Sequence, residues 1–183
     1  MEKLQAGTIL IADPFLKDPN FLRSVIFLCE HQPEGSFGFV LNRKSEYVIG
    51  DLIEELAGCR FPVFYGGPVQ QNTIHFLHRR AGLITGGEKV TGEIYWGGEF
   101  EEVVSLLRND KLSEEDLKLF IGYSGWSESQ LNEELNQQTW LTTFSSEDIV
   151  FANNISEIWR NTLKQLGGKY EQLIHYPIDP QLN

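Results

Sequence analysis

The chain has 183 residues, of which 41% are hydrophobic and 22% are charged, and it carries a formal net charge of -11. These values fit a soluble globular protein with one domain over 1–183, and no apolar run approaches the roughly 20 residues that a membrane-spanning helix needs. An acidic excess of this size disfavours direct binding to nucleic acid or to an anionic membrane, because both require clustered Lys and Arg.

The two cysteines, Cys29 and Cys59, form no C-x-x-C pair and are too few for a disulfide framework. Cys29 lies in an apolar run, which is typical of a small buried side chain, whereas Cys59 follows Gly58 in a predicted loop. A redox bridge between the two thiols is the less favoured alternative. The N-terminus shows no signal-peptide pattern, so we expect a cytoplasmic protein with reduced thiols.

The first part of the chain is predicted to form strands, because apolar and β-branched runs alternate with Gly and Pro. Three such runs cover 7–12, 24–31 and 37–42. The short turn at 32–36 predicts that 24–42 is an antiparallel hairpin.

The ends of this hairpin carry candidate binding residues, namely Glu30, His31, Asn42 and Arg43. One interpretation of Glu30 and His31 is a general acid–base pair. Neighbouring residues of a strand face opposite sides, however, so we favour hydrogen bonds that stabilise the turn. For Arg43 we favour an ion pair with a nearby carboxylate such as Asp51 or Glu54.

A short helix is predicted at 49–58 and a further strand at 62–65. Tyr65 leads from this strand into Gly66 and Gly67. Two glycines after a strand can present backbone N–H groups to a ligand, but neither the Lys nor the capped helix of a phosphate-binding loop follows. We favour a tight turn, and we keep these three residues as binding candidates.

The strand expected at 73–78 contains His75 and His78. Residues three apart on a strand face opposite sides, so the two imidazoles make a poor metal chelate, and we expect no metal site. His78 is kept as a binding candidate. The adjacent Arg79 and Arg80 are too few for a nucleic-acid surface, but they can bind a carboxylate or a phosphate.

Four more elements follow from the apolar periodicity, namely a strand at 89–96, a helix at 100–108, a strand at 139–143 and a helix at 155–166. The tail at 169–183 has no regular pattern, so we expect it to be loose.

The stretch 119–135 carries the strongest local signal in the sequence. Its first three residues are apolar and predict a strand, and Gly122 and Gly125 predict a sharp turn after it. A helix is expected to begin at Ser127, since Gln130 completes a capping-box spacing.

Three interpretations are compatible with such a turn. In the first, Ser124 is a nucleophile between a strand and a helix, but Trp126 stands at the position of the second Gly of the G-x-S-x-G pattern. In the second, an anion binds at the helix N-terminus, but the carboxylate of Glu128 in the first turn would repel it. We favour the third interpretation, in which Tyr123 and Trp126 pack beside the turn, and we keep both as binding candidates.

Hairpins interleaved with helices predict an α+β fold with a mixed, largely antiparallel sheet. Eight segments in order, at 7–14, 21–31, 38–43, 65–69, 77–78, 122–126, 130–131 and 140–141, resemble the bacterial YqgE/AlgH family. The resemblance implies a cytosolic protein whose sheet is partly rolled into a barrel and flanked by helices. The family is commonly described as regulating transcription, from a link to alginate production in pseudomonads. It brings no catalytic residue, cofactor or metal.

Three residues depart from the family pattern. Ser124 stands where Ala is usual, which argues further against a serine nucleophile. Ser129 stands where Gly is usual, and Lys44 replaces a frequent Pro, so the turn after Arg43 is expected to be less rigid.

Two functional hypotheses follow. The first is a non-enzymatic regulatory or interaction protein that acts through protein partners and does not bind DNA directly. The second is an enzyme or small-ligand binder with a polar pocket at glycine-flanked strand ends. That pocket would gather Glu30, His31, Asn42, Tyr65, Gly66, Gly67, His78 and Tyr123.

Overall fold

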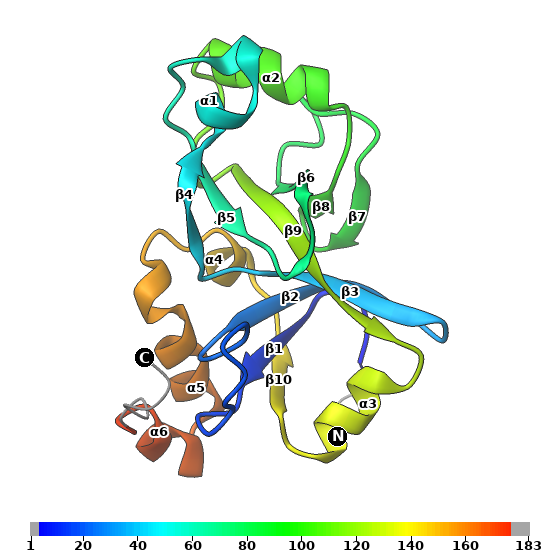
Figure 1. Ribbon diagram of the computed structural model, residues 1–183, viewed down its shortest axis with the longest axis vertical. Helices are drawn as coiled ribbons and strands as arrows, with labels where there is room; N and C mark the ends of the chain where they lie inside the picture. Colours follow the sequence, from blue (N-terminus) through cyan, green and yellow to red (C-terminus); the bar gives the residue numbers. More distant parts are fainter. Residues whose placement is uncertain (1–3, 177–183) are drawn as a thin grey trace.

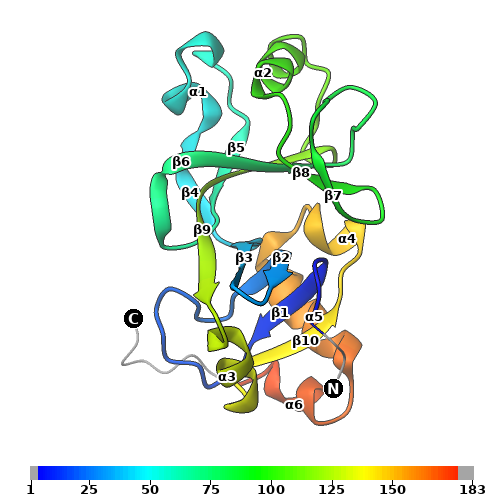
Figure 2. The same cartoon turned by 90° about the vertical axis from the view of Figure 1, so that its right-hand side faces the viewer.

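The computed structural model describes residues 4–176, and it confirms an α+β fold whose antiparallel sheet curls into a half-barrel (Figure 1, Figure 2). The strands run in the order β10-β1-β2-β3-β9-β6-β8-β7, with β5 beside β9 and β4 beside β5. The strands are β1 Thr8–Ala12, β2 Val25–Gln32, β3 Gly35–Val40, β4 Lys44–Val48, β5 Pro62–Tyr65, β6 Val69–His78, β7 Glu88–Thr91, β8 Ile94–Trp96, β9 Leu117–Ser127 and β10 Trp140–Phe144. The helices are α1 Ile49–Leu52, η1 Glu54–Leu56, α2 Phe100–Arg108, α3 Gln130–Asn136, α4 Glu147–Val150, η2 Ile155–Glu157, α5 Ile158–Leu166 and α6 Lys169–Leu173.

Strand β9 joins the two halves of the sheet. Its first part pairs with β5 in parallel and with β6 antiparallel, and its last part pairs with β3. The upper half in Figure 1 therefore contains β4 to β8, and the lower half contains β10, β1, β2 and β3. Because successive side chains of a strand face opposite sides, β9 contributes to a core on each of its faces.

The lower half of the sheet is covered on both faces. Alternate residues of β1, β2 and β3 face either helices α4 and α5 or helix α3. The first core contains Ile9, Ile11, Val25, Phe27, Phe39, Phe120, Trp159 and Leu163. The second contains Leu10, Ala12, Ile26, Leu28, Val40, Trp126, Leu131 and Trp140. Burial on both faces explains why these strands read as continuous apolar runs in the sequence.

The upper half has a third core, which lies under α1 and α2 at the top of Figure 1. It gathers Ile49, Val63, Phe76, Val103, Leu107, Leu117, Leu119 and Ile121. Helix α2 forms as the sequence predicts, because Val103 and Leu107 repeat at helical spacing on its buried face.

The stretch 119–135 differs from the prediction. The strand does not end at Gly122 but continues to Ser127, so the predicted sharp turn is wrong. Helix α3 begins at Gln130, after Ser129 in the left-handed region at φ 63°. Half of the predicted capping box is present, since the backbone N–H of Ser127 donates to Gln130 Oε1 at 3.1 Å.

Three other expectations need correction. The helix predicted at 49–58 is two short turns, α1 and η1, because Ile53 between them is extended. The strand predicted at 89–96 is a hairpin, β7 and β8, because Gly92 turns the chain at φ 52°. The tail is not loose throughout: α6 forms at its start, although 177–183 lie outside the described residues. Within residues 4–176, none of the helices has the length and apolar character to span a membrane.

Candidate functional site

The structure distributes the ten predicted binding residues over separate places. Glu30, Tyr123 and Trp126 line one cleft, which we call the aromatic cleft. Arg43, Tyr65 and Gly67 line a smaller pocket. His31 lines a third depression beside α3, and Asn42, Gly66 and His78 are engaged inside the fold.

The aromatic cleft has a volume of about 660 Å³ and lies between the β2–β3 hairpin, β6, β8 and β9. Figure 1 shows the elements that supply its lining residues, namely the projecting β2–β3 hairpin and the strands β6, β8 and β9. Its aromatic and imidazole lining consists of Phe37, His75, Trp96, Tyr123 and Trp126. Phe37, His75, Trp96 and Tyr123 are only partly buried, so they keep surface available for a ligand.

The rings of the cleft hold one another at steep angles. Phe37 meets Trp96 at a centroid distance of 4.8 Å and 63°, and it meets Tyr123 at 6.2 Å and 81°. His75 meets Tyr123 at 5.8 Å and 80°. These T-shaped contacts hold the rings in place, and each is worth about 0.5–1.5 kcal/mol beyond burial.

Gly125 makes room for the wall of the cleft. A Cβ at this position would lie 3.2 Å from Cε2 of Tyr123, so any side chain there would press on the tyrosine ring. The glycine that the sequence assigns to a turn therefore serves a close approach within a strand.

The charge of the cleft is negative. Glu30 and Glu34 are among its lining residues, and the lining contains neither Lys nor Arg. Neither carboxylate belongs to an ion pair within the part of the chain that the structure describes.

The hydrogen bonds of His75 define its tautomer. The hydroxyl of Thr73 donates its one proton to the carbonyl of Gln70 at 2.7 Å, so it must accept from His75 Nε2 at 3.0 Å. Burial lowers the pKa of His75, which favours the neutral ring. A neutral ring protonated on Nε2 leaves Nδ1 as a hydrogen-bond acceptor.

The pocket at Arg43 is smaller, at about 280 Å³. The Arg43 guanidinium donates to the carbonyl of Pro19 at 3.1 Å rather than pairing with Asp51 or Glu54, so that expectation is wrong. Burial lowers the pKa of Arg43, and Asp18 partly opposes this effect. Arg43 thus ties the loop before β2 to the strand end.

Gly66 and Gly67 lie where the connection from β5 to β6 crosses strand β9. A Cβ on Gly66 would lie 2.4 Å from the carbonyl oxygen of Gly122, and one on Gly67 would lie 2.3 Å from the carbonyl of Tyr123. These glycines permit close approach between the β5–β6 connection and β9. Ser124, on the same strand, is fully buried and donates to the carbonyl of Gly66 at 3.0 Å.

Ser124, the nucleophile considered from the sequence, and the Cys29 thiol both have structural roles. Ser124 has no imidazole or carboxylate among its bonded partners in residues 4–176. Cys29 is buried, and burial raises the pKa of its thiol well above the ordinary value, with Glu30 adding to the effect. A thiol in this state is a poor nucleophile.

The structure contains one serine–histidine contact that the sequence does not predict. The Nδ1 atom of His31 lies 2.7 Å from the Ser36 hydroxyl, across the β2–β3 hairpin. The two residues are direct partners in the ladder, so the hairpin register alone brings them together. No third group orients His31 through a bond within residues 4–176, so the pair is a contact that closes the turn.

His78, Arg79 and Arg80 each bind other groups of the chain. His78 is fully buried, donates from Nε2 to the carbonyl of Gly97 at 3.0 Å, and accepts from the backbone N–H of Arg80 at 3.1 Å on Nδ1. Arg79 pairs with Glu147 at 3.1 Å and Arg80 with Asp116 at 2.7 Å. Across residues 4–176 there is no group of three side chains suited to a metal ion.

Comparisons with known proteins cover nearly the whole chain. A family model described as AlgH-like matches residues 9–171. A UPF0301 protein of Chlorobium luteolum is 39% identical over 182 residues, which is 100% of this chain and 96% of the relative. A UPF0301 protein of Cytophaga hutchinsonii is 39% identical over 181 residues, or 98% of this chain and 100% of the relative.

Two solved structures share the fold. The solution structure of the AlgH protein from Pseudomonas aeruginosa has a TM-score of 0.75 at 26% identity, and covers 98% of this chain and 100% of that one. The crystal structure of protein DIP2367 from Corynebacterium diphtheriae has a TM-score of 0.81 at 19% identity, with 96% and 94% covered. The second likeness concerns the fold alone.

Proposed function

Because the chain belongs to the AlgH-like family, whose members match it from end to end, we propose that it is a non-enzymatic regulatory or interaction protein that acts through protein partners. The aromatic cleft is its contact surface.

The observation that carries this proposal is the preformed set of half-buried rings in the cleft. Phe37, Trp96 and Tyr123 are held by one another, yet each keeps exposed surface. Aromatic side chains placed in this way are typical anchor points of protein interfaces, because they bring a large contact area at little cost in conformational entropy. Rings fixed before binding reduce the ordering that association requires.

The reactive groups favour binding over catalysis. Ser124 donates into the fold, Cys29 is shielded with a raised pKa, and His31 meets Ser36 as a ladder partner. A nucleophile needs a positioned base that is itself oriented by a third group. The described side chains of the cleft supply carboxylates and rings, which suit recognition.

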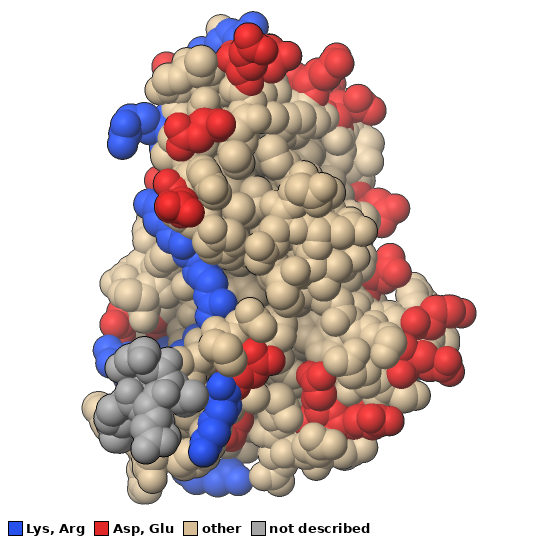
Figure 3. Space-filling view, viewed as in Figure 1, with Lys and Arg blue, Asp and Glu red and all other residues tan. Residues whose placement is uncertain are grey.

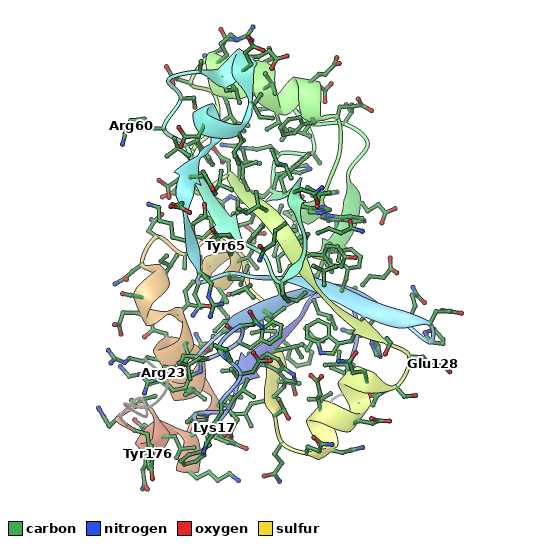
Figure 4. The ribbon with its side chains drawn as sticks, viewed as in Figure 1. Lys17, Arg23, Arg60, Tyr65, Glu128 and Tyr176 are labelled. Carbon is green, nitrogen blue, oxygen red and sulfur yellow. The ribbon has the colours of Figure 1, made fainter. Side chains whose placement is uncertain are left out.

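The net charge of -11 supports a protein partner over DNA, because a phosphate backbone is bound by an excess of Lys and Arg. Lys and Arg visible in Figure 3 lie on the left-hand side, whereas the right-hand edge carries Asp and Glu. Figure 4 places Lys17, Arg23 and Arg60 on the left and Glu128 at the right-hand edge. Arg23 is engaged by the carbonyl of Tyr176 and by the Trp159 ring at 4.8 Å, so it is not a free phosphate contact.

A second candidate function, a small-ligand binder, is favoured by the size of the cleft. Its volume of about 660 Å³ falls within the range of small-molecule sites, about 300–1,000 Å³. Predominantly apolar walls with a few polar groups are also usual in such sites.

Affinity capture from a cytoplasmic extract of the source cell, the compartment that we propose, tests both candidates. Wild-type protein and the Trp96→Ala variant are immobilised in parallel, and retained proteins and small molecules are identified by mass spectrometry. Phe144→Ala is the matched control, because Phe144 is 62% exposed on β10, outside the cleft.

We expect one or more proteins to be retained by wild type and by the control, and lost with Trp96→Ala. Retention of a specific metabolite without any protein would favour the second candidate. Protein retention that is equal in all three samples would remove the cleft from the proposal.

A further inference from the structure

We propose that the aromatic cleft recognises a positively charged side chain, Arg or Lys, on an exposed segment of the partner protein. This inference rests on the proposed function, and it adds the chemistry of the group that is bound.

The rings supply the first part of the argument. A cation is attracted to the face of Trp, Tyr or Phe within about 6 Å of the ring centroid, and Trp binds best. In a T-shaped pair one ring points its edge at the other, so its own faces stay uncovered by that neighbour. Phe37 makes such contacts with both Trp96 and Tyr123, so π faces remain available around one cavity.

These rings are not already occupied by a cation of the chain itself. Among the described residues, the cation–π contacts involve Trp159, Phe151, Tyr95, Phe64 and Tyr170. Lys89 lies 5.7 Å from the Tyr95 ring, and Tyr95 is not part of the cleft lining. Among the described residues, no cation of the chain therefore competes for the rings of Phe37, Trp96 and Tyr123.

The carboxylates supply the second part. Glu30 and Glu34 line the same cavity, and neither has an ion-pair partner in the part of the chain that the structure describes. A guanidinium or ammonium group entering the cleft would meet both a carboxylate and a ring face. That combination suits a cation and disfavours an anion or a phosphate.

His75 supplies the third part. Its Nε2 donates to Thr73, which leaves the lone pair of Nδ1 for a donor. Arg and Lys side chains are donors with no acceptor, so the carboxylates of Glu30 and Glu34 and the Nδ1 atom of His75 can accept from them. The cleft thus offers the hydrogen-bond acceptors that a cationic side chain requires.

The charge of the whole chain acts in the same direction. A net charge of -11 attracts basic segments from a distance and raises the rate of encounter. The attraction is long-range and unspecific, so selectivity has to come from the rings and the carboxylates of the cleft.

A peptide titration followed by two-dimensional NMR tests the inference. The probes are three capped tripeptides, Gly-Arg-Gly, Gly-Lys-Gly and Gly-citrulline-Gly, in which citrulline has the shape of arginine without its charge. The backbone amides of Phe37, Tyr123 and Gly125 and the indole N–H of Trp96 report on the cleft. We expect saturable shifts of these signals with the Arg and Lys peptides, and about tenfold weaker binding of the citrulline peptide.

Variants separate recognition from general attraction. Glu30→Gln keeps the shape of the side chain and is expected to weaken Arg-peptide binding about two- to threefold. Trp96→Leu is expected to remove most of the binding, whereas Phe144→Leu, outside the cleft, should leave it unchanged. If Trp96→Leu does not fold, the Glu30→Gln and Glu34→Gln pair still tests the charge contribution.

Equal binding of the citrulline and Arg peptides would overturn the inference, as would a complete lack of shifts in the cleft. Shifts that spread evenly over acidic residues, persist in Trp96→Leu and vanish between about 20 and 300 mM salt would show unspecific attraction and would also overturn it. Capture of a protein partner that depends on Trp96 would still support the proposed function in these cases. The two proposals therefore fail separately.

Discussion

The hydroxyl of Ser124 donates a hydrogen bond to the carbonyl oxygen of Gly66 across 3.0 Å, where the connection from β5 to β6 crosses the middle of β9. The same oxygen accepts from the backbone N–H of Val40 at 2.9 Å. One carbonyl thus connects β3, β9 and the crossing chain. This arrangement explains a serine at a position where it has no catalytic partner.

Ser124→Ala should cost little stability. The substitution removes one donor, but the carbonyl of Gly66 keeps its bond from Val40, so no buried acceptor is left without a partner. We expect the free energy of unfolding to fall by about 0.5–1.5 kcal/mol, measured by urea denaturation. A loss above about 3 kcal/mol would mean that the hydroxyl has a role beyond this bond.

Gly66→Ala should be far more damaging. The new Cβ would lie 2.4 Å from the Gly122 carbonyl oxygen and 2.8 Å from Cδ1 of Phe39, and the carbonyl is backbone that cannot move aside. We expect a loss of at least about 3 kcal/mol in the free energy of unfolding.

The matched control for this prediction is Gly82→Ala, because a Cβ there meets nothing within 4 Å. It should change stability by less than about 0.5 kcal/mol in the same urea experiment. Equal effects at Gly66 and Gly82 would show that close approach is not the reason for the glycine at 66.

Glu134→Ala should destabilise the lower half of the sheet. The Oε2 atom of Glu134 accepts from Nε1 of Trp126 at 2.8 Å and from Nε1 of Trp140 at 2.7 Å, and both indoles are buried. Removing the carboxylate leaves two buried indole donors without an acceptor, besides the exposed donor Nε2 of Gln130 at 3.0 Å, which should cost about 2–4 kcal/mol.

Glu133→Ala, on the same helix, is the control, because Glu133 is exposed and its side chain has no bonded partner within residues 4–176. Chemical denaturation followed by tryptophan fluorescence measures both variants. If the two substitutions cost the same, helix propensity rather than the indole bonds would account for the loss.

Lys118 should make the free energy of unfolding depend on pH in the neutral to alkaline range. Burial lowers the pKa of its ammonium from 10.5 to about 7, with Glu114 opposing the effect, while Nζ donates to the carbonyl of Val150 at 3.3 Å. Between these two values the unfolded chain binds one proton more than the folded chain. The free energy of unfolding should therefore rise with pH from about 7 to 10, by up to about 1.4 kcal/mol per pH unit.

Lys118→Met keeps an apolar stem against Phe64 but cannot titrate. We expect the difference in unfolding free energy between wild type and this variant to shift in favour of wild type as pH rises through that window. Parallel pH profiles for the two proteins would show that the folded-state pKa of Lys118 is not lowered.

Local patterns predict much of the fold. The hairpin at 24–42 follows from two apolar runs around a Pro/Gly turn, and α2 follows from the spacing of Val103 and Leu107. The sequence also indicates the α+β class, because both kinds of pattern alternate along the chain. These features depend on residues that are close in sequence.

The glycines of 122–126 show where local reasoning fails. Gly122 and Gly125 have the sequence signature of a turn, yet both lie within β9. A Cβ on Gly122 would lie 2.5 Å from the carbonyl oxygen of Gly67, so only glycine fits there. A Cβ on Gly125 would lie 3.2 Å from Cε2 of the Tyr123 ring. The contact at Gly122 involves a segment that is distant in the sequence, so no local pattern reports it, whereas the contact at Gly125 lies within β9 itself.

The aromatic cleft could be predicted only in part. Glu30 and Tyr123 belong to the predicted polar pocket and Trp126 to the predicted turn, but no sequence pattern singles out Phe37 or Trp96 as binding residues. Their meeting depends on the order β3-β9-β6-β8, which a single sequence does not determine. His75 was considered as a metal ligand, and only its bond to Thr73 defines it as an acceptor.

The position of β9 also bears on how the chain reaches its native state. Its partners β3, β5 and β6 all precede it, so they leave the ribosome while the strand that they pair with has not yet been made. Unpaired strand edges promote self-association, and pairing between distant segments is slow. Synthesis that stops before Leu117 would release a polypeptide with three open edges, so nascent chains of this protein should engage chaperones until Ser127 has emerged.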